Sequence, residues 1–243
     1  DEFTSLFTEM DIQKVFRCST QKLKEWLRLV MPLRGTPKAS VGSLQFVRDC
    51  LADESVSARF CESDRLLVVL AAFLRGIHKK WECKADMKTV MRLKKFPRES
   101  CALLAAVFAS DVGIASGLPD GECEALASRL SLFVRGDTAR DAGLLLARAR
   151  SISMHGFRDG DACTAWLGCC LAELARVHRF SQGGAVACSL REEAGAAVMR
   201  SELFAAERVW LPMVNFLSAK HRLLAGISGA VRESIVLARK EVR

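Results

Sequence analysis

The chain of 243 residues contains no tyrosine, a single asparagine and five prolines. Because helix breakers are few and the strong helix formers Ala, Leu and Arg dominate, long helices can form without interruption. The same bias is also typical of a GC-rich genome. No stretch alternates polar and apolar residues between hairpin turns, so we expect no sheet. The composition therefore predicts an all-α protein.

The sequence has ten cysteines but lacks the spacings that bind metal. No two cysteines form C-x-x-C, and no two histidines stand three to five residues apart. A structural zinc site needs such short spacings, so we predict no metal site. Most cysteines lie in apolar runs, such as Cys101 beside Leu103 and Leu104, where a thiol behaves as a small apolar group. These features predict reduced thiols and an intracellular reducing compartment.

Local catalytic and membrane motifs are also lacking. There is no G-x-x-x-x-G-K-[ST] loop and no G-x-G-x-x-G loop, and no apolar run reaches 18 residues. The sequence thus predicts a non-enzymatic protein without cofactor or membrane span. A helical enzyme whose site forms only in three dimensions is the third possibility, after the two binding functions given below. The chain starts at Asp1, from which we expect a fragment or a processed form. The four histidines are far apart: His78, His155, His178 and His221.

Apolar residues recur at helical spacing along nearly the whole chain. Ser19 is expected to cap a helix over residues 22–33, and Ser43 is expected to cap the next helix. Ser63 with Asp64 is expected to open a strongly apolar helix that runs to Leu74. Further helices are predicted over residues 85–95, 99–110, 120–134, 137–151, 161–177, 190–209 and 212–239.

Two segments, residues 100–130 and 141–169, resemble each other at an offset of 40 or 41 residues. Each is predicted to form two antiparallel helices joined by a loop with Gly and Asp. Such pairs stack into an α-solenoid, and an irregular helical bundle is the alternative. We therefore predict one helical domain over residues 1–243. Its sub-regions are N-terminal helices (1–62), a helical-repeat region (63–177) and C-terminal helices (178–243).

Residues 140–167, RDAGLLLARARSISMHGFRDGDACTAWL, resemble the octotricopeptide and FAST-kinase-like repeats. Those repeats run from an acidic residue through a small-apolar helix and a Gly turn to Asp and a second apolar helix. The resemblance implies a helical-repeat RNA-binding factor of an organelle, such as the mitochondrial matrix. The chain departs from the pattern at Gly143, early in the first helix, and at Arg148 and Arg150, where apolar residues are usual. No terminal RAP-type domain is visible.

Positive charge is concentrated in residues 75–98, which hold nine basic residues and only Glu82 and Asp86 as acids. This basic segment carries a net charge of +7, against +8 for the whole chain. Such a patch attracts an anionic partner, most often nucleic acid. Four of its cations share one helix face, and a smaller arginine cluster lies near residue 150. The predicted RNA-binding residues are Arg75, Lys79, Lys80, Lys84, Lys88, Arg92, Lys95, Arg148, Arg150 and Arg158.

Each of these features has a simpler interpretation. The basic segment can be a solvated helix face, Trp81 can pack in the core instead of stacking on a base, and the arginine cluster can pair with nearby aspartates. The leading prediction is an RNA-binding or RNA-processing-complex subunit that contacts the phosphate backbone. The alternative is a protein–protein scaffold or adaptor subunit of a larger assembly, whose basic face meets an acidic partner.

Overall fold

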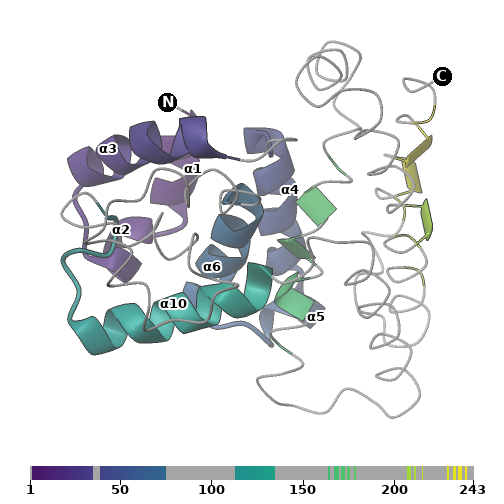
Figure 1. Cartoon of the computed structure of the whole chain (residues 1–243). Helices are drawn as coiled ribbons and strands as arrows, with labels where there is room; N and C mark the ends of the chain where they lie inside the picture. Colours follow the sequence, from purple (N-terminus) through teal and green to yellow (C-terminus); the bar gives the residue numbers. More distant parts are fainter. Residues whose placement is uncertain are drawn as a thin grey trace.

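The computed structural model describes residues 2–34, 39–74 and 113–134, together with scattered residues from 164 to 239. Within these parts every regular element is a helix and none is a strand, which confirms the all-α prediction (Figure 1). The solenoid arrangement of repeated helix pairs stays a prediction. The helices run in the order α1 (Glu2–Glu9), α2 (Ile12–Phe16), α3 (Thr20–Val30), η1 (Met31–Leu33), α4 (Val41–Ala52), α5 (Glu54–Ser57), α6 (Glu62–Phe73) and α10 (Asp120–Val134).

The starts of α3 and α4 show one correct and one wrong cap prediction. The Ser19 hydroxyl accepts a hydrogen bond from the Lys22 backbone N–H at 3.1 Å, as expected for an N-cap. For α4 the cap is Ser40, whose hydroxyl accepts from the Ser43 N–H at 3.1 Å. Ser43 is inside the helix and fully buried, so its predicted role as the cap was wrong.

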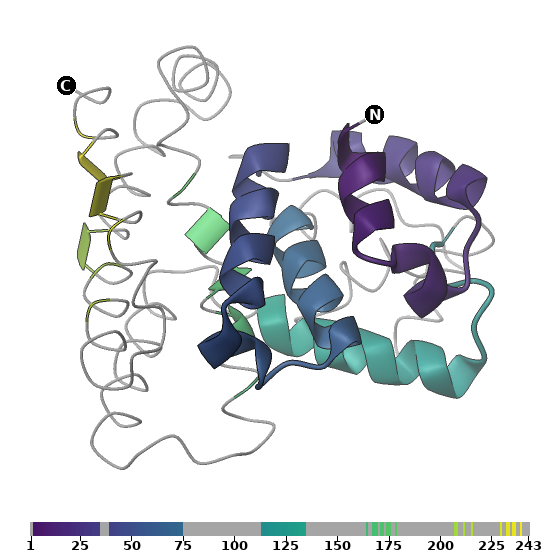
Figure 2. The same ribbon diagram turned by 180° about the vertical axis from the view of Figure 1, so that it is seen from behind.

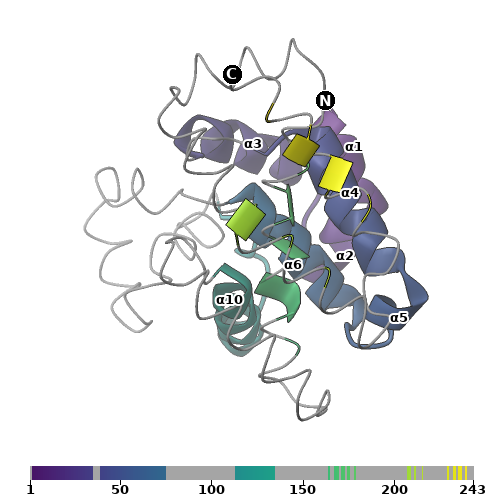
Figure 3. The ribbon, with the colours of Figure 1, turned by 90° about the vertical axis from the view of Figure 1, so that its right-hand side faces the viewer.

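Helix α6 lies at the centre of the described bundle. It packs against α4 on one side and α10 on the other, and α1 contacts both α3 and α4. Figures 1 and 2 show α10 crossing α6 rather than running alongside it. In Figure 3, α6 lies between α4 and α10. All residues from Leu66 to Leu74 are buried, as a helix that is apolar on every face requires.

Four aromatic rings meet at the end of α6. The ring of Phe73 lies 5.4 Å from that of Phe3, 5.2 Å from that of Phe7 and 6.1 Å from that of Trp26, between centroids. The Phe7 contact is edge-to-face, the geometry that the ring quadrupole favours. These contacts join α1 and α3 to the C-terminal turn of α6.

A buried arginine completes this cluster. Arg34 follows η1, is 2% exposed, and lies over the rings of Phe73 at 4.3 Å and Phe3 at 5.1 Å. Its Nε–H donates to the Phe73 carbonyl at 3.0 Å, and its Nη2 donates to the Ala39 carbonyl. Burying a guanidinium is costly unless its N–H groups find acceptors, which these carbonyls supply.

The described residues from Thr164 to His178 are helical and lie within the predicted helix over 161–177 and at its end. A methyl group added to Gly168 would meet the Phe133 ring of α10 at 2.4 Å and Val68 of α6 at 3.0 Å. The His178 ring stacks on Phe46 of α4, with centroids 4.3 Å apart. Burial lowers the pKa of His178, and the charge of Asp49 partly opposes this shift. This stretch therefore packs against three helices of the N-terminal bundle.

Candidate functional site

All ten predicted RNA-binding residues, and Trp81 with them, lie outside the described residues. The structure does describe the residues that border the basic segment. Leu74, which directly precedes it, and Ile114, which follows it, are both fully buried in the same hydrophobic cluster. In the sequence, the basic segment therefore lies between two residues that are buried in one core.

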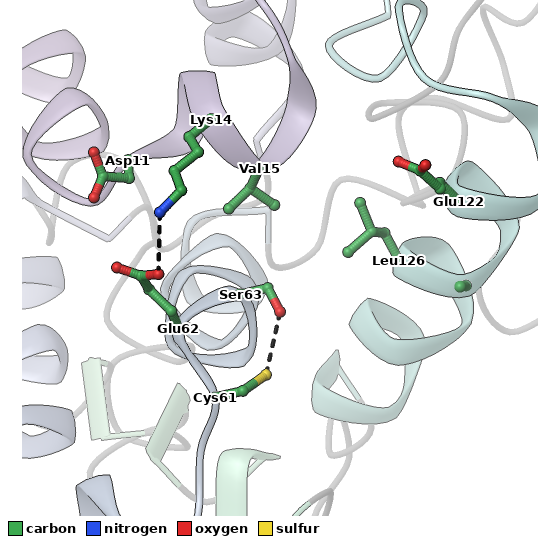
Figure 4. Close-up of a pocket in the computed structure, with 9 residues that line it drawn as sticks. Asp11, Lys14, Val15, Cys61, Glu62, Ser63, Glu122 and Leu126 are labelled. Atoms are coloured by element: carbon green, nitrogen blue, oxygen red, sulfur yellow. Dashed lines mark hydrogen bonds and ion pairs between the residues drawn. The ribbon is translucent and has the colours of Figure 1, made fainter.

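The described residues form one candidate site of their own, a groove between α2, the start of α6 and the start of α10 (Figure 4). Its volume is about 500 Å³, within the range of roughly 300–1,000 Å³ that is usual for ligand pockets. We call it the α2/α6/α10 groove. It is lined by Asp11, Lys14, Val15, Cys61, Glu62, Ser63, Glu122, Ala125 and Leu126.

Two tight turns place α2 at this groove. Asp11 before α2 and Arg17 after it adopt left-handed backbone angles, with φ of 55° and 49°. This region is uncommon for residues other than glycine, although Asp is among the residues that enter it most often. The Asp11 carbonyl accepts from the backbone N–H groups of Lys14 and Val15, at 2.9 and 3.1 Å. The short helix therefore presents Lys14 and Val15 to the groove.

The start of α6 contributes a thiol, a carboxylate and a hydroxyl. Cys61 occupies the N-cap position with an extended backbone, but its side chain forms no capping hydrogen bond. Its Sγ instead lies 3.2 Å from the Ser63 Oγ. Glu62 in the first turn accepts from Lys14 Nζ at 3.5 Å. A carboxylate at this position also interacts favourably with the helix dipole.

Helix α10 closes the opposite side, where Glu122 and Leu126 face the start of α6 (Figure 4). Glu122 accepts from Arg17 Nη2 at 3.1 Å. The loop before α10 also approaches this end of α2, because a Cβ on Gly117 would lie 3.4 Å from the Arg17 carbonyl oxygen. The groove is therefore bordered by ion pairs that link three separate elements.

A half-buried ion pair fixes α10 against α6. Arg129 donates from Nε and Nη2 to the two carboxylate oxygens of Asp64, both at 2.8 Å. The Asp64 side chain is 8% exposed, and the Arg129 guanidinium also lies 5.5 Å from the Phe133 ring centroid. A bidentate pair of this kind is geometrically specific, so it sets the separation of the two groove walls.

The groove offers little for catalysis. Cys61 is exposed, but no histidine lines the groove, and His178, the one histidine among the described residues, stacks on α4. No group of three potential metal ligands occurs in the described part of the chain. A nucleophilic thiol usually has a neighbouring base, and the residues that line the groove supply no imidazole beside Cys61.

The other described cysteines differ from Cys61. All five described cysteines are free; Cys50 and Cys169 are buried, and Cys18 and Cys123 are half-buried. Burial raises the pKa of the Cys18 thiol, and the Cys123 thiol donates to the Ala115 carbonyl at 3.1 Å. The apolar environment expected for most cysteines is thus found at several of them, while Cys61 stands on the surface.

Comparison with protein families and with curated proteins identified no related protein. No protein-family model matches the chain, and no curated protein matches its sequence. Among the described helices, none is long and apolar enough to cross a membrane.

Proposed function

We propose that this chain is a non-enzymatic RNA-binding protein that holds the phosphate backbone through its basic segment, residues 75–98. The observation that carries the proposal is the segregation of charge. Residues 1–74 contain ten basic and ten acidic side chains, whereas the basic segment has a net charge of +7. An excess of one sign confined to a short segment creates a local potential that concentrates a polyanion.

Ion pairing in the described helices supports this division. Arg48 pairs with Glu9 at 2.8 Å and Arg129 pairs with Asp64 at 2.8 Å, so cations of the bundle have acidic partners nearby. The basic segment itself contains only two acids, Glu82 and Asp86, for its nine cations. Phosphates supplied by a partner would relieve that repulsion.

The phosphate contacts are assigned to Lys79, Lys80, Lys84, Lys88, Arg92 and Lys95, with Arg75 extending the patch. The last four of the six share one face if residues 84–95 are helical. The resemblance of residues 140–167 to organellar RNA-binding repeats favours the same function and an organelle matrix as its place. Arg148, Arg150 and Arg158 would then form a second, smaller contact.

The test changes Lys84, Lys88, Arg92 and Lys95 together to Gln, which is a fair helix former. Affinity should fall by a similar factor for unrelated RNA sequences, because phosphate contacts position a protein without specifying sequence. On single-stranded RNA the slope of log affinity against log salt should shrink by about 0.7 for each phosphate that the variant no longer neutralises. Fluorescence titrations at several salt concentrations measure both quantities.

A matched control tests whether RNA binding depends on the basic segment or only on the net charge of the protein. Lys24 and Arg28 are exposed on α3 with the same spacing as Lys84 and Lys88. Changing Lys24 and Arg28 to Gln should leave the salt slope unchanged, while changing Lys84 and Lys88 to Gln should lower it. Equal salt slopes for the two double variants would mean that the basic segment is only a solvent-exposed face without a role in RNA binding. Unchanged RNA binding together with loss of an acidic protein partner would favour the scaffold function.

A further inference from the structure

We propose that the α2/α6/α10 groove binds a short segment of a protein partner that carries apolar side chains flanked by lysine or arginine. This inference concerns a surface that the RNA-binding proposal does not use, and neither depends on the other. It is carried by three features of the groove: an apolar floor, an acid-rich rim and weak ion pairs on that rim.

The floor is the first feature. Val15 and Leu126 are half-buried and pack against the hydrophobic core, while Ala125 is exposed beside them. These three side chains therefore leave apolar surface exposed at the edge of the hydrophobic core. A partner that inserts a leucine-like side chain here removes apolar surface from water on both molecules, which favours association.

The rim determines the charge of the occupant. Three carboxylates, on Asp11, Glu62 and Glu122, line the groove, whereas the cations at its rim are Lys14 and Arg17, so acids outnumber bases there. Each ionised carboxylate can accept several hydrogen bonds, so its existing partner leaves acceptor capacity for another cation. A phosphate placed here would meet like charge. The groove thus selects a basic segment and disfavours the RNA backbone.

The rim pairs can be exchanged at low cost. The Lys14 and Glu62 side chains are 72% and 69% exposed, and their charged atoms lie 3.5 Å apart. The Arg17–Glu122 pair is also exposed, with 58% and 49% of the two side chains accessible. Exposed pairs of this kind are weak because water screens them, so a partner's lysine or arginine can compete for the same carboxylates.

The groove walls are held in place before binding. The bidentate Asp64–Arg129 pair joins α6 to α10, and the left-handed turn at Asp11 fixes the start of α2. A preformed groove avoids part of the ordering cost that association otherwise carries. The site therefore suits a flexible peptide segment that gains its conformation on docking.

The experiment uses the full chain and a short fluorescein-labelled peptide that has Leu at helical spacing and Lys elsewhere. Two companion peptides replace Lys by Glu or Leu by Ser, and fluorescence anisotropy measures binding of all three. We expect saturable binding of the Lys/Leu peptide only. Binding of the Glu/Leu peptide with equal affinity, or no saturable binding of the Lys/Leu peptide, would overturn the proposal.

A matched pair of variants locates the site. Ala125 is an exposed, groove-lining residue of α10, and Ala52 is an exposed residue of α4 that does not line the groove. Ala125→Arg should lower the affinity for the Lys/Leu peptide at least tenfold. A tenfold change corresponds to about 1.4 kcal/mol of binding free energy. Ala52→Arg adds the same charge elsewhere and should leave the affinity unchanged. Equal effects of the two variants would contradict the assignment.

Cys61 provides a readout inside the groove that does not depend on a variant. Saturating Lys/Leu peptide should slow alkylation of Cys61 by iodoacetamide, measured by peptide mass spectrometry, while alkylation of half-buried Cys18 should not change. Unchanged Cys61 alkylation at saturation would place the peptide elsewhere and overturn the proposal. Protection of Cys61 by single-stranded RNA would also overturn it, because it would assign the groove to nucleic acid.

Discussion

Cys50 and Cys61 are eleven residues apart in the sequence but lie in opposite environments. Cys50 is 4% exposed on α4, whereas Cys61 lies exposed at the start of α6. Burial, reinforced by the charges of Asp49 and Asp53, raises the pKa of the Cys50 thiol to about 12. Because the thiolate is the reactive form, these two thiols should differ greatly in reactivity.

We expect iodoacetamide at pH 8 to modify Cys61 in the native protein while Cys50 stays unmodified until the chain unfolds. Mass spectrometry of timed digests, with and without denaturant, measures both rates. A Cys61→Ser variant is the control, since it should remove the early modification at this position and leave Cys50 protected. Native-state modification of Cys50 at the rate of Cys61 would contradict the burial of α4.

At the level of single helices, sequence patterns succeed where the information is local. Helix α10 has the predicted bounds, residues 120–134, because Pro119 precedes it and acidic residues fill its first turn. The apolar run of α6 also marks a buried helix. The patterns missed α1, α2 and α5, which are short and offer few turns over which a period can be read.

The cap of α4 shows a limit of local patterns. Ser40 and Ser43 both lie near the start of that helix, ahead of Leu44, and serine at either position is a suitable N-cap residue type. The cap is the residue with an extended backbone, and Ser40 has it, with ψ of 165°. Because both candidates are serines, the residue type alone cannot show which of them is the N-cap.

We expect Ser40→Ala to destabilise the protein by about 1 kcal/mol, because the Ser43 N–H would then have no side-chain acceptor. Ser43→Ala should cost less, since its hydroxyl contacts the Ser40 Oγ at 2.9 Å but does not cap the helix. Urea unfolding followed by circular dichroism gives both free energies of unfolding. A larger loss of stability for Ser43→Ala than for Ser40→Ala would indicate that Ser43 is the cap.

The groove lies beyond what local patterns can predict. Lys14, Glu62 and Glu122 come from three elements, and the first two are 48 positions apart in the sequence. They meet only through packing of α2 and α10 on α6. The Asp64–Arg129 pair spans 65 residues. The basic segment, in contrast, can be found by counting charges, because its nine cations lie within residues 75–98.

On the scale of the whole molecule, distant parts of the chain share one core. A single hydrophobic cluster includes Leu6 in α1, Phe133 in α10, Leu167 and Ile235. At Gly168 the Phe133 ring leaves no room for a side chain, because an added Cβ would lie 2.4 Å from it. The absence of a side chain at this glycine allows the stretch around residue 168 to approach α10 directly.

We expect Gly168→Ala to lower the melting temperature of the whole protein. Its methyl group would lie 2.4 Å from the buried Phe133 ring, and such overpacking costs about 1–3 kcal/mol. Alanine gains at most about 1 kcal/mol of helix propensity in return. Gly121→Ala in the first turn of α10 is the matched control. Apart from its chain neighbours and its own helix backbone, no atom would lie within 4 Å of the added Cβ, so the variant should be neutral or stabilising. A Gly168→Ala protein as stable as the control variant would contradict this packing.

The meeting of Phe3 with Phe73 also has a consequence for synthesis on the ribosome. Seventy residues separate the two rings, so at about 5–20 residues per second α1 waits roughly 4–14 seconds before its partner has been made. During that interval its apolar face has no native cover from α6. Helix α1 is therefore among the parts whose native contacts are delayed during translation, and chaperones that bind nascent apolar segments have time to reach it.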